Sequence, residues 1–198
     1  MQSKVYGIGL NCGKYPTSIN NKRIKEYSLW AGMLLRCTEN FWEANANYKG
    51  TTCSESFKSY AFFYEWCQSQ IGFKNIDANG EVWPLDKDIL VKGNRCYSES
   101  GCVFIPRRIN QLLVSRALFR GDSPIGVSWS ERTGKFTVWC KGLKTRHYLG
   151  SFETELEAFS IYKEFKQETI RQVAEQYKSQ IDPRAYKALR NYEVSIDD

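Results

Sequence analysis

The sequence contains one histidine, His147, and no Cys-x-x-Cys pair. A single imidazole excludes a site built from several histidines, and the cysteine spacing argues against a structural zinc ion. Cys96 and Cys102 bracket a loop but lack further ligands nearby in the sequence. The seven cysteines are odd in number and widely scattered, so we expect free thiols in a reducing cytoplasm.

Long hydrophobic runs are also absent. No apolar stretch reaches the roughly 18 residues of a membrane span, and the first residues, MQSKVYGIGL, lack the hydrophobic region of a signal peptide. We therefore expect a cytoplasmic protein without a membrane segment. A hydrophobic fraction of 42% and an aromatic fraction of 15% are typical of a folded chain. The net charge of +6 favours a polyanionic partner over a small-molecule ligand and leaves the oligomeric state open.

The first half of the chain combines helical and strand signals. Apolar spacing predicts helices over residues 26–37 and about 55–70, the second with Ser54 as its N-cap, and a loop between them. Residues 82–119 then predict a ββα unit. It comprises a strand near 82–85, a tight turn at Gly93-Asn94, an apolar strand at CVF (102–104) and a helix over about 106–119.

The second half alternates in period two. After a linker at 120–124, residues 125–152 predict three short antiparallel strands, and Thr154 with Glu157 forms a capping box at the start of a long helix. The predicted fold class is α+β. Residues 1–120 form a helical region with the ββα unit, and residues 121–198 form a three-stranded antiparallel sheet packed on a long helix.

The two faces of this predicted sheet differ in chemistry. Val127, Phe136, Val138 and Leu149 face the helix, and His147 falls on the same side as a structural histidine. The opposite face combines basic, polar and aromatic residues that we expect to bind double-stranded DNA. They are Ser128, Ser130, Arg132, Lys135, Thr137, Trp139, Lys141, Arg146 and Tyr148. A polar face that is simply solvated is the alternative.

Three motifs in this segment occur in a characteristic order. Gly126-Val127, Gly134-Lys135-Phe136 and Tyr148 to Phe152, followed by the helix start at Thr154, resemble the APETALA-type DNA-binding domain of plant ethylene-response factors. The resemblance implies that the sheet binds the major groove. Ser128 stands where that family has an arginine, which leaves the base preference open. The same domain occurs fused to phage HNH homing endonucleases.

The ββα unit carries a second resemblance. Leu85-Asp86-Lys87-Asp88, followed by the strand with Cys102 and the helix with Asn110, resembles the ββα-metal (HNH-type) nucleases, including the phage recombination endonuclease VII family. A looser likeness to phage HNH-like endonucleases spans most of residues 4–113. The resemblance implies phosphodiester hydrolysis that depends on Mg²⁺ or Mn²⁺, with Asp86 and Asn110 as metal ligands. Asn94 would hold the loop and polarise the base.

The position after Asp86 departs from the family pattern, because Lys87 replaces the usual catalytic histidine. Lys87 acts either as a general base with a lowered pKa or as a fixed cation, with Asp88 or a metal-bound hydroxide as the base. We favour the cation, because the flanking aspartates stabilise the protonated ammonium. The structural alternative makes Asp86 and Asp88 strand-end acids paired with Lys92 or Arg95.

These resemblances predict a site-selective DNA endonuclease or nickase of the phage homing type. The alternatives are a non-catalytic DNA-binding regulator that keeps a degenerate nuclease fold, and a structure-selective junction nuclease. A sheet that reads base sequence argues against the junction nuclease, because selection by shape needs no base contacts.

Overall fold

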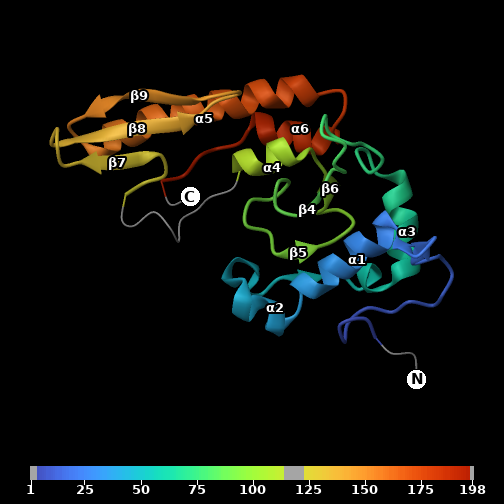
Figure 1. Ribbon diagram of the computed structural model, residues 1–198. Coiled ribbons are helices and arrows are strands. Elements are labelled where there is room, and N and C mark those ends of the chain that lie inside the picture. The colour runs from blue at the N-terminus through green and yellow to red at the C-terminus, as the bar shows by residue number, and fades with distance from the viewer. Residues whose placement is uncertain (1–3, 114–122, 197–198) are drawn as a thin grey trace. The chain divides into compact units, whose positions relative to one another are not determined.

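The computed structural model describes residues 4–113 and 123–196 and has the expected mixed α+β character (Figure 1). It divides into unit 1, which contains Met1–Arg107 and Gln180–Ala185, and unit 2, which contains Arg108–Ser179 and Tyr186–Asp198. The predicted domain boundary at residues 120–121 lies outside the described residues, as does the second half of the predicted helix over 106–119. The two units are therefore described separately.

Unit 1 combines short helices with two-residue strands. Its helices are α1 (Lys25–Arg36), α2 (Glu39–Ala44) and α3 (Tyr60–Ser69), and its 3₁₀ turns are η1 (Ala46–Tyr48) and η2 (Ser56–Lys58). The strands pair as β1 (Ser18–Ile19) with β2 (Lys22–Arg23), β3 (Thr52–Cys53) with β5 (Cys96–Tyr97), and β4 (Leu85–Asp86) with β6 (Val103–Phe104). The β3–β5 pair is parallel and the other two pairs are antiparallel.

The core of unit 1 is aromatic. Trp30, Phe57, Tyr60, Phe63 and Phe104 are fully buried, and the indole Nε1 of Trp30 donates a hydrogen bond to the carbonyl oxygen of Phe57 at 2.8 Å. The rings of Phe57 and Phe63 meet edge to face with their centroids 5.1 Å apart. Several of the aromatic residues in η2 and α3 therefore form the centre of the core of this unit.

The loop predicted between the first two helices is wrong in part, because α2 and η1 lie within it. The hydroxyl of Thr38 accepts a hydrogen bond from the Phe41 backbone N–H at 3.4 Å and caps α2, and Glu39 places an acid in the first turn. The Asn-rich composition that suggested a loop is tolerated because α2 has only six residues.

The N-cap predicted for the helix over residues 55–70, which corresponds to α3, is also wrong. Ser54 accepts a hydrogen bond from the Phe57 backbone N–H at 3.3 Å and so closes the turn of η2. The α-helix begins one turn later, where Ser59 accepts from the Phe62 backbone N–H at 3.4 Å. This stretch has two serines that can cap a helix, Ser54 and Ser59, and the first of them starts a 3₁₀ turn.

Unit 2 contains the predicted three-stranded antiparallel sheet, and its strands are adjacent in the order β7-β8-β9 (Figure 1). The strands are β7 (Val127–Ser130), β8 (Lys135–Lys141) and β9 (Arg146–Phe152), and α5 (Glu155–Tyr177) packs on one face. The predicted capping box is confirmed, because Thr154 and Glu157 exchange side-chain and backbone hydrogen bonds. Two shorter helices, α4 (Arg107–Leu113) and α6 (Pro183–Arg190), cross the division between the units along the chain.

The sheet packs its apolar face against α5, as predicted. Val127 and Val138 are buried against Phe159 and Tyr162, and the predicted inward residues Phe136 and Leu149 pack against the same cluster. Burial of this face fixes which side of each strand is directed away from the helix.

A β-bulge interrupts the alternation of β9. Val138 pairs with Gly150, whereas the next residue of β8, Trp139, pairs with Tyr148, so that Leu149 is an extra residue on β9. Gly150 has a φ of +132°, which a glycine adopts without strain. The bulge shifts the alternation in the residues that follow it, and Phe152 packs against the core cluster.

Two glycines of unit 2 allow a matched test of this packing. Gly126 (φ +79°) and Gly134 (φ +61°) both have left-handed backbones, but a Cβ on Gly126 would lie 2.1 Å from the ring of Tyr162, whereas nothing lies within 4 Å at Gly134. We expect Gly134→Ala to reduce the free energy of unfolding by about 1 kcal/mol and Gly126→Ala by about 3–5 kcal/mol. Urea unfolding followed by circular dichroism measures both, and equal losses would contradict the packing of β7 on α5.

Candidate functional site

The acidic loop after β4, residues 86–96, is held by its own side chains. Asp86 is the last residue of β4, and its Oδ1 accepts hydrogen bonds from the backbone N–H groups of Asp88 at 3.0 Å and Ile89 at 2.8 Å. Asp86 is only 7% exposed. A short carboxylate that bonds the backbone two and three residues ahead closes a tight turn. The Leu-Asp-Lys-Asp motif therefore lies in a well-defined turn at the end of a strand.

The carboxyl group of Asp86 is in an unfavourable place for a negative charge. Burial and then the charge of Asp88 raise the pKa of Asp86 to about 6, although the two backbone hydrogen bonds oppose that shift. Mg²⁺ binds hard oxygen ligands and is held in proteins by one or two carboxylates together with water and phosphate. Two neighbouring carboxyl groups, one of them buried, fit such an ion, because a cation would offset their mutual repulsion.

Lys87 is tied into the same loop. Its side chain is 12% exposed, and its Nζ donates hydrogen bonds to the carbonyl oxygen of Asn94 at 2.8 Å and to Oδ2 of Asp88 at 3.2 Å. The ammonium also lies 5.9 Å from the centroid of the Tyr97 ring. Lys87 is therefore a basic residue with defined hydrogen-bond partners inside this loop.

Asn94 closes the loop from the other side. Its Nδ2 donates to the carbonyl oxygens of Lys87 at 2.6 Å and Cys96 at 3.0 Å, and its Oδ1 accepts from the Cys96 backbone N–H at 3.0 Å. The predicted turn at Gly93-Asn94 is present, since Gly93 has a φ of +78° and the Asn94 N–H donates to the Val91 carbonyl at 3.0 Å. Asn94 thus ties the backbone at Lys87, near the start of the loop, to the backbone at Cys96, at its end.

Asn110 belongs to a different unit from this loop. It is half-buried in α4 and belongs to unit 2, whereas Asp86 belongs to unit 1. Their joint role as metal ligands stays a prediction. Across residues 4–113 and 123–196, His, Cys, Asp and Glu side chains form no group of three or more that could hold a metal ion.

The outward face of the sheet in unit 2 has a compact cationic and aromatic cluster. Trp139 pairs with Tyr148, and Lys141 pairs with Arg146, so all four side chains project from one end of the β8–β9 ladder. The Trp139 and Tyr148 rings are 5.1 Å apart, and the Arg146 guanidinium lies 4.9 Å from the Trp139 ring centroid. Trp139 is 39% exposed and Tyr148 53%. The cluster therefore offers both positive charge and flat apolar surface to solvent.

The other end of this face is polar. Ser128 pairs with Thr137 and Ser130 with Lys135, and Lys135 forms an ion pair with Glu153 at 2.7 Å. The ion pair neutralises one of the predicted DNA-binding cations. Lys141 and Arg146, at the opposite end of the strands, take no part in this ion pair.

The structure changes the placement of three residues relative to the predicted sheet. Arg132 lies in the turn between β7 and β8 and not on a strand. His147 lies on the helix side, with its ring 5.2 Å from Phe165 and its Nε2 3.2 Å from the hydroxyl of Thr145, but it is exposed. Ser151 was missed, because the bulge places it on the outward face, where it bonds the Tyr148 hydroxyl at 2.6 Å.

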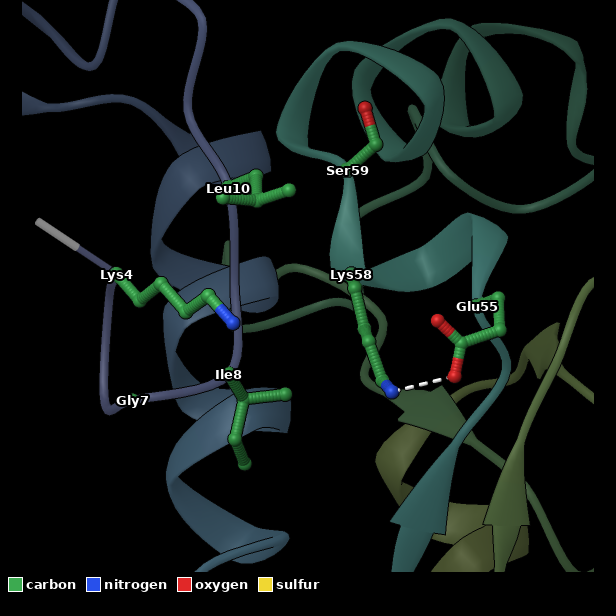
Figure 2. A pocket seen from close by; sticks show the side chains of 7 residues that line it. All are labelled: Lys4, Gly7, Ile8, Leu10, Glu55, Lys58 and Ser59. Atoms are coloured by element: carbon green, nitrogen blue, oxygen red, sulfur yellow. Dashed lines mark hydrogen bonds and ion pairs between the residues drawn. The ribbon is translucent and has the colours of Figure 1, made fainter. Parts of the chain in front are cut away.

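Unit 1 also has a pocket that the sequence did not indicate (Figure 2). Its volume is about 320 Å³, and its lining residues are Lys4, Gly7, Ile8, Leu10, Glu55, Lys58 and Ser59. Lys58 is paired with Glu55 along one wall. None of the lining residues belongs to the acidic loop.

Comparisons with known proteins identify no relative of this chain. No protein-family model matches the chain, and searches of curated proteins and of solved structures found no significant match. Within the described part of the chain, no helix is both long and apolar enough to cross a bilayer.

The raised pKa of Asp86 predicts a pH dependence of stability. In a chelating buffer the folded state retains the Asp86 proton up to pH of about 6, while the unfolded state loses it near the ordinary value of 3.8. Proton uptake on folding makes stability fall as the pH rises through this window, by about 3 kcal/mol for a shift of about two pH units. Asp86→Asn removes this loss, so its advantage over the wild type grows between pH 4 and pH 6.

Asp77→Asn is the matched control. The Asp77 carboxylate also accepts two backbone hydrogen bonds, from Asn79 at 2.8 Å and Glu81 at 3.0 Å, but in an exposed turn. Urea unfolding at several pH values gives the free energies. An Asp86→Asn advantage that is independent of pH would contradict the buried state of this carboxyl group.

Proposed function

We propose that this chain is a DNA endonuclease or nickase of the phage homing type, which binds duplex DNA with the sheet of unit 2 and hydrolyses a phosphodiester at the acidic loop of unit 1. The observation that carries the proposal is the cluster of Lys141, Arg146, Trp139 and Tyr148 on the outward face of the sheet. The buried Asp86 beside Asp88 supports the hydrolytic part.

The outward face suits DNA for three reasons. A sheet face of this size fits the major groove, where arginine and lysine bind phosphates and guanine edges. Stacking on Trp139 holds the Arg146 guanidinium in place before any ligand arrives, which reduces the entropy lost on binding. The exposed Tyr148 ring adds apolar contact area of the kind that packs on sugars or thymine methyl groups.

The acidic loop has the parts that metal-assisted hydrolysis needs. Mg²⁺, when bound, offsets charge on the scissile phosphate and on the leaving oxygen. Asp86 would supply a buried carboxylate to hold the ion, and the hydrogen bonds of Asn94 to the backbone keep the loop that carries Asp86 closed. Asp88, whose side chain is 52% exposed, is accessible to accept a proton from the attacking water.

Lys87 is best suited to the role of a fixed cation. Its Nζ donates to the carbonyl oxygen of Asn94 and to the carboxylate of Asp88, so the group is already engaged as a donor within its own loop. A general base would need the opposite environment, in which burial without acceptors disfavours the charge. Lys87 therefore holds positive charge beside the substrate phosphate in this proposal.

A non-catalytic DNA-binding protein is the second candidate. The observation that favours it is the same lysine, whose Nζ is bonded to groups of its own loop at the position where the HNH family has a catalytic base. In that case the sheet alone would carry the function. Cleavage assays on supercoiled DNA, with Mg²⁺ and with EDTA, distinguish the two candidates.

Substitutions in the acidic loop test hydrolysis. We expect Asp86→Ala to lower the rate of plasmid cleavage in Mg²⁺ at least about 10³-fold, equivalent to about 4 kcal/mol, while DNA affinity stays within about threefold. Lys87→Arg should stay within about tenfold of the wild type, because arginine keeps the charge but cannot accept a proton. Asp77→Ala is the control, because it removes an aspartate that closes a different turn. Full cutting by Asp86→Ala, or by the wild type in EDTA, would refute the assignment.

Substitutions on the sheet test DNA binding separately. We expect Arg146→Ala and Lys141→Ala each to weaken duplex binding and to reduce the slope of log K against log salt by about 0.9, the release of one counterion. Arg171→Ala removes a charge from α5, on the other side of the sheet, and should leave the slope unchanged. Fluorescence anisotropy between low and moderate salt measures the slopes. Equal effects of all three variants would indicate a general charge effect without a binding face.

A further inference from the structure

The N-terminal segment of unit 1 forms a closed turn over residues 5–9. The backbones of Val5 and Gly9 exchange two hydrogen bonds, each 2.9 Å long. Between them Tyr6 and Gly7 reverse the chain with left-handed φ angles of +51° and +73°. The glycine adopts this conformation without steric cost. The segment therefore has a defined backbone geometry.

This turn is attached to the rest of unit 1 on two sides. A Cβ on Gly9 would lie 2.6 Å from the ring of the buried Trp30, so the backbone at this point lies directly against α1. Leu10 then joins the η2–α3 segment, because its N–H donates to the Lys58 carbonyl at 2.8 Å and its carbonyl accepts from the Tyr60 N–H at 2.9 Å. These contacts fix the spacing between residues 4–10 and residues 55–59.

The pocket of about 320 Å³ lies between these two segments (Figure 2). Ile8 and Leu10 point from the N-terminal segment toward the segment that carries Lys58 (Figure 2), and Leu10 is 48% exposed. The volume is near the lower end of the range of about 300–1,000 Å³ that ligand pockets occupy. The pocket therefore suits a small molecule and is too small for a duplex or a folded partner.

Two ammonium groups and one carboxylate line this pocket. Lys58 is paired with Glu55, whose side chain is 88% exposed. Lys4 forms no ion pair with any residue that the structure describes. The lining therefore carries one positive charge in excess, next to the apolar surface of Ile8 and Leu10.

We propose that this pocket binds a small organic anion with an apolar body. The ammonium groups of Lys4 and Lys58 bind its head, and Ile8 and Leu10 contact its body. Phosphate monoesters and carboxylates share this chemistry. Glu55 competes with the anionic head for Lys58 and so limits the affinity. This inference does not depend on the proposed nuclease function, because no lining residue belongs to the acidic loop or to the sheet of unit 2.

Methyl-detected NMR titrations of the full chain with phenyl phosphate and, separately, with hexanoate test the proposal. We expect the methyl signals of Ile8 and Leu10 to shift with a dissociation constant on the order of 1 mM. The probe that binds more tightly identifies the preferred head group. Phenol and hexanol have similar apolar bodies without the charge, and they should bind about fivefold more weakly.

Two pairs of variants locate the charges that act on the ligand. Lys4→Gln should weaken binding about threefold, whereas Lys22→Gln, which removes an exposed lysine of β2 outside the pocket, should leave it unchanged. Glu55→Gln should strengthen binding about threefold, because it frees Lys58 from its ion pair. Glu43→Gln is the matched control for that change, since it removes an exposed acid of α2.

Circular dichroism verifies that each variant is folded. The proposal is overturned if neither anion shifts the Ile8 and Leu10 signals well above the expected dissociation constant, or if the neutral analogues bind as tightly. It is also overturned if Lys22→Gln weakens binding as much as Lys4→Gln, because the anions would then respond to net charge alone. A loss of affinity in Glu55→Gln would contradict the competition for Lys58 and would likewise overturn the proposal.

Discussion

The side-chain amide of Asn94 is the constraint on which the candidate catalytic loop depends. One planar group bonds the backbone on both sides of the loop, at Lys87 and at Cys96. Because the amide is satisfied in both directions, the turn that buries Asp86 and the contact that fixes Lys87 occur in the same closed segment. The geometry of three charged residues thus depends on one uncharged side chain.

The two units present polar residues in different ways. Unit 1 buries a carboxylate within a loop whose strands have only two residues, so the precision of that site comes from side-chain hydrogen bonds. Unit 2 instead uses a regular ladder on a helix, which spaces Lys141, Arg146, Trp139 and Tyr148 by the strand repeat. A loop of this kind suits chemistry at one atom, whereas a ladder suits contact over a long surface.

Patterns that are local in the sequence predicted the structure well. Period-two alternation identified β7, β8 and β9 and their buried side, and the T-x-x-E motif identified the start of α5. Composition failed at α2, because a single Thr38 cap outweighs an Asn-rich stretch in so short a helix. The parallel β3–β5 pair was not predictable, because it joins distant segments and leaves no periodic signal. The roles of Asp86, Lys87 and Asn110 still rest on the family resemblance.

The bulge in β9 accommodates one residue more than the ladder needs and so decides which residues after it face the core. Phe152 faces the core and Ser151 faces outward because the bulge takes up Leu149 as one residue in excess of β8. Deleting Leu149 would remove the bulge and restore plain alternation, and Ser151 would still lie opposite Thr137 and Phe152 opposite Phe136. At this point β9 can therefore lose one residue without exchanging its two faces, and an in-frame codon loss there would remove only the packing of Leu149 against the core.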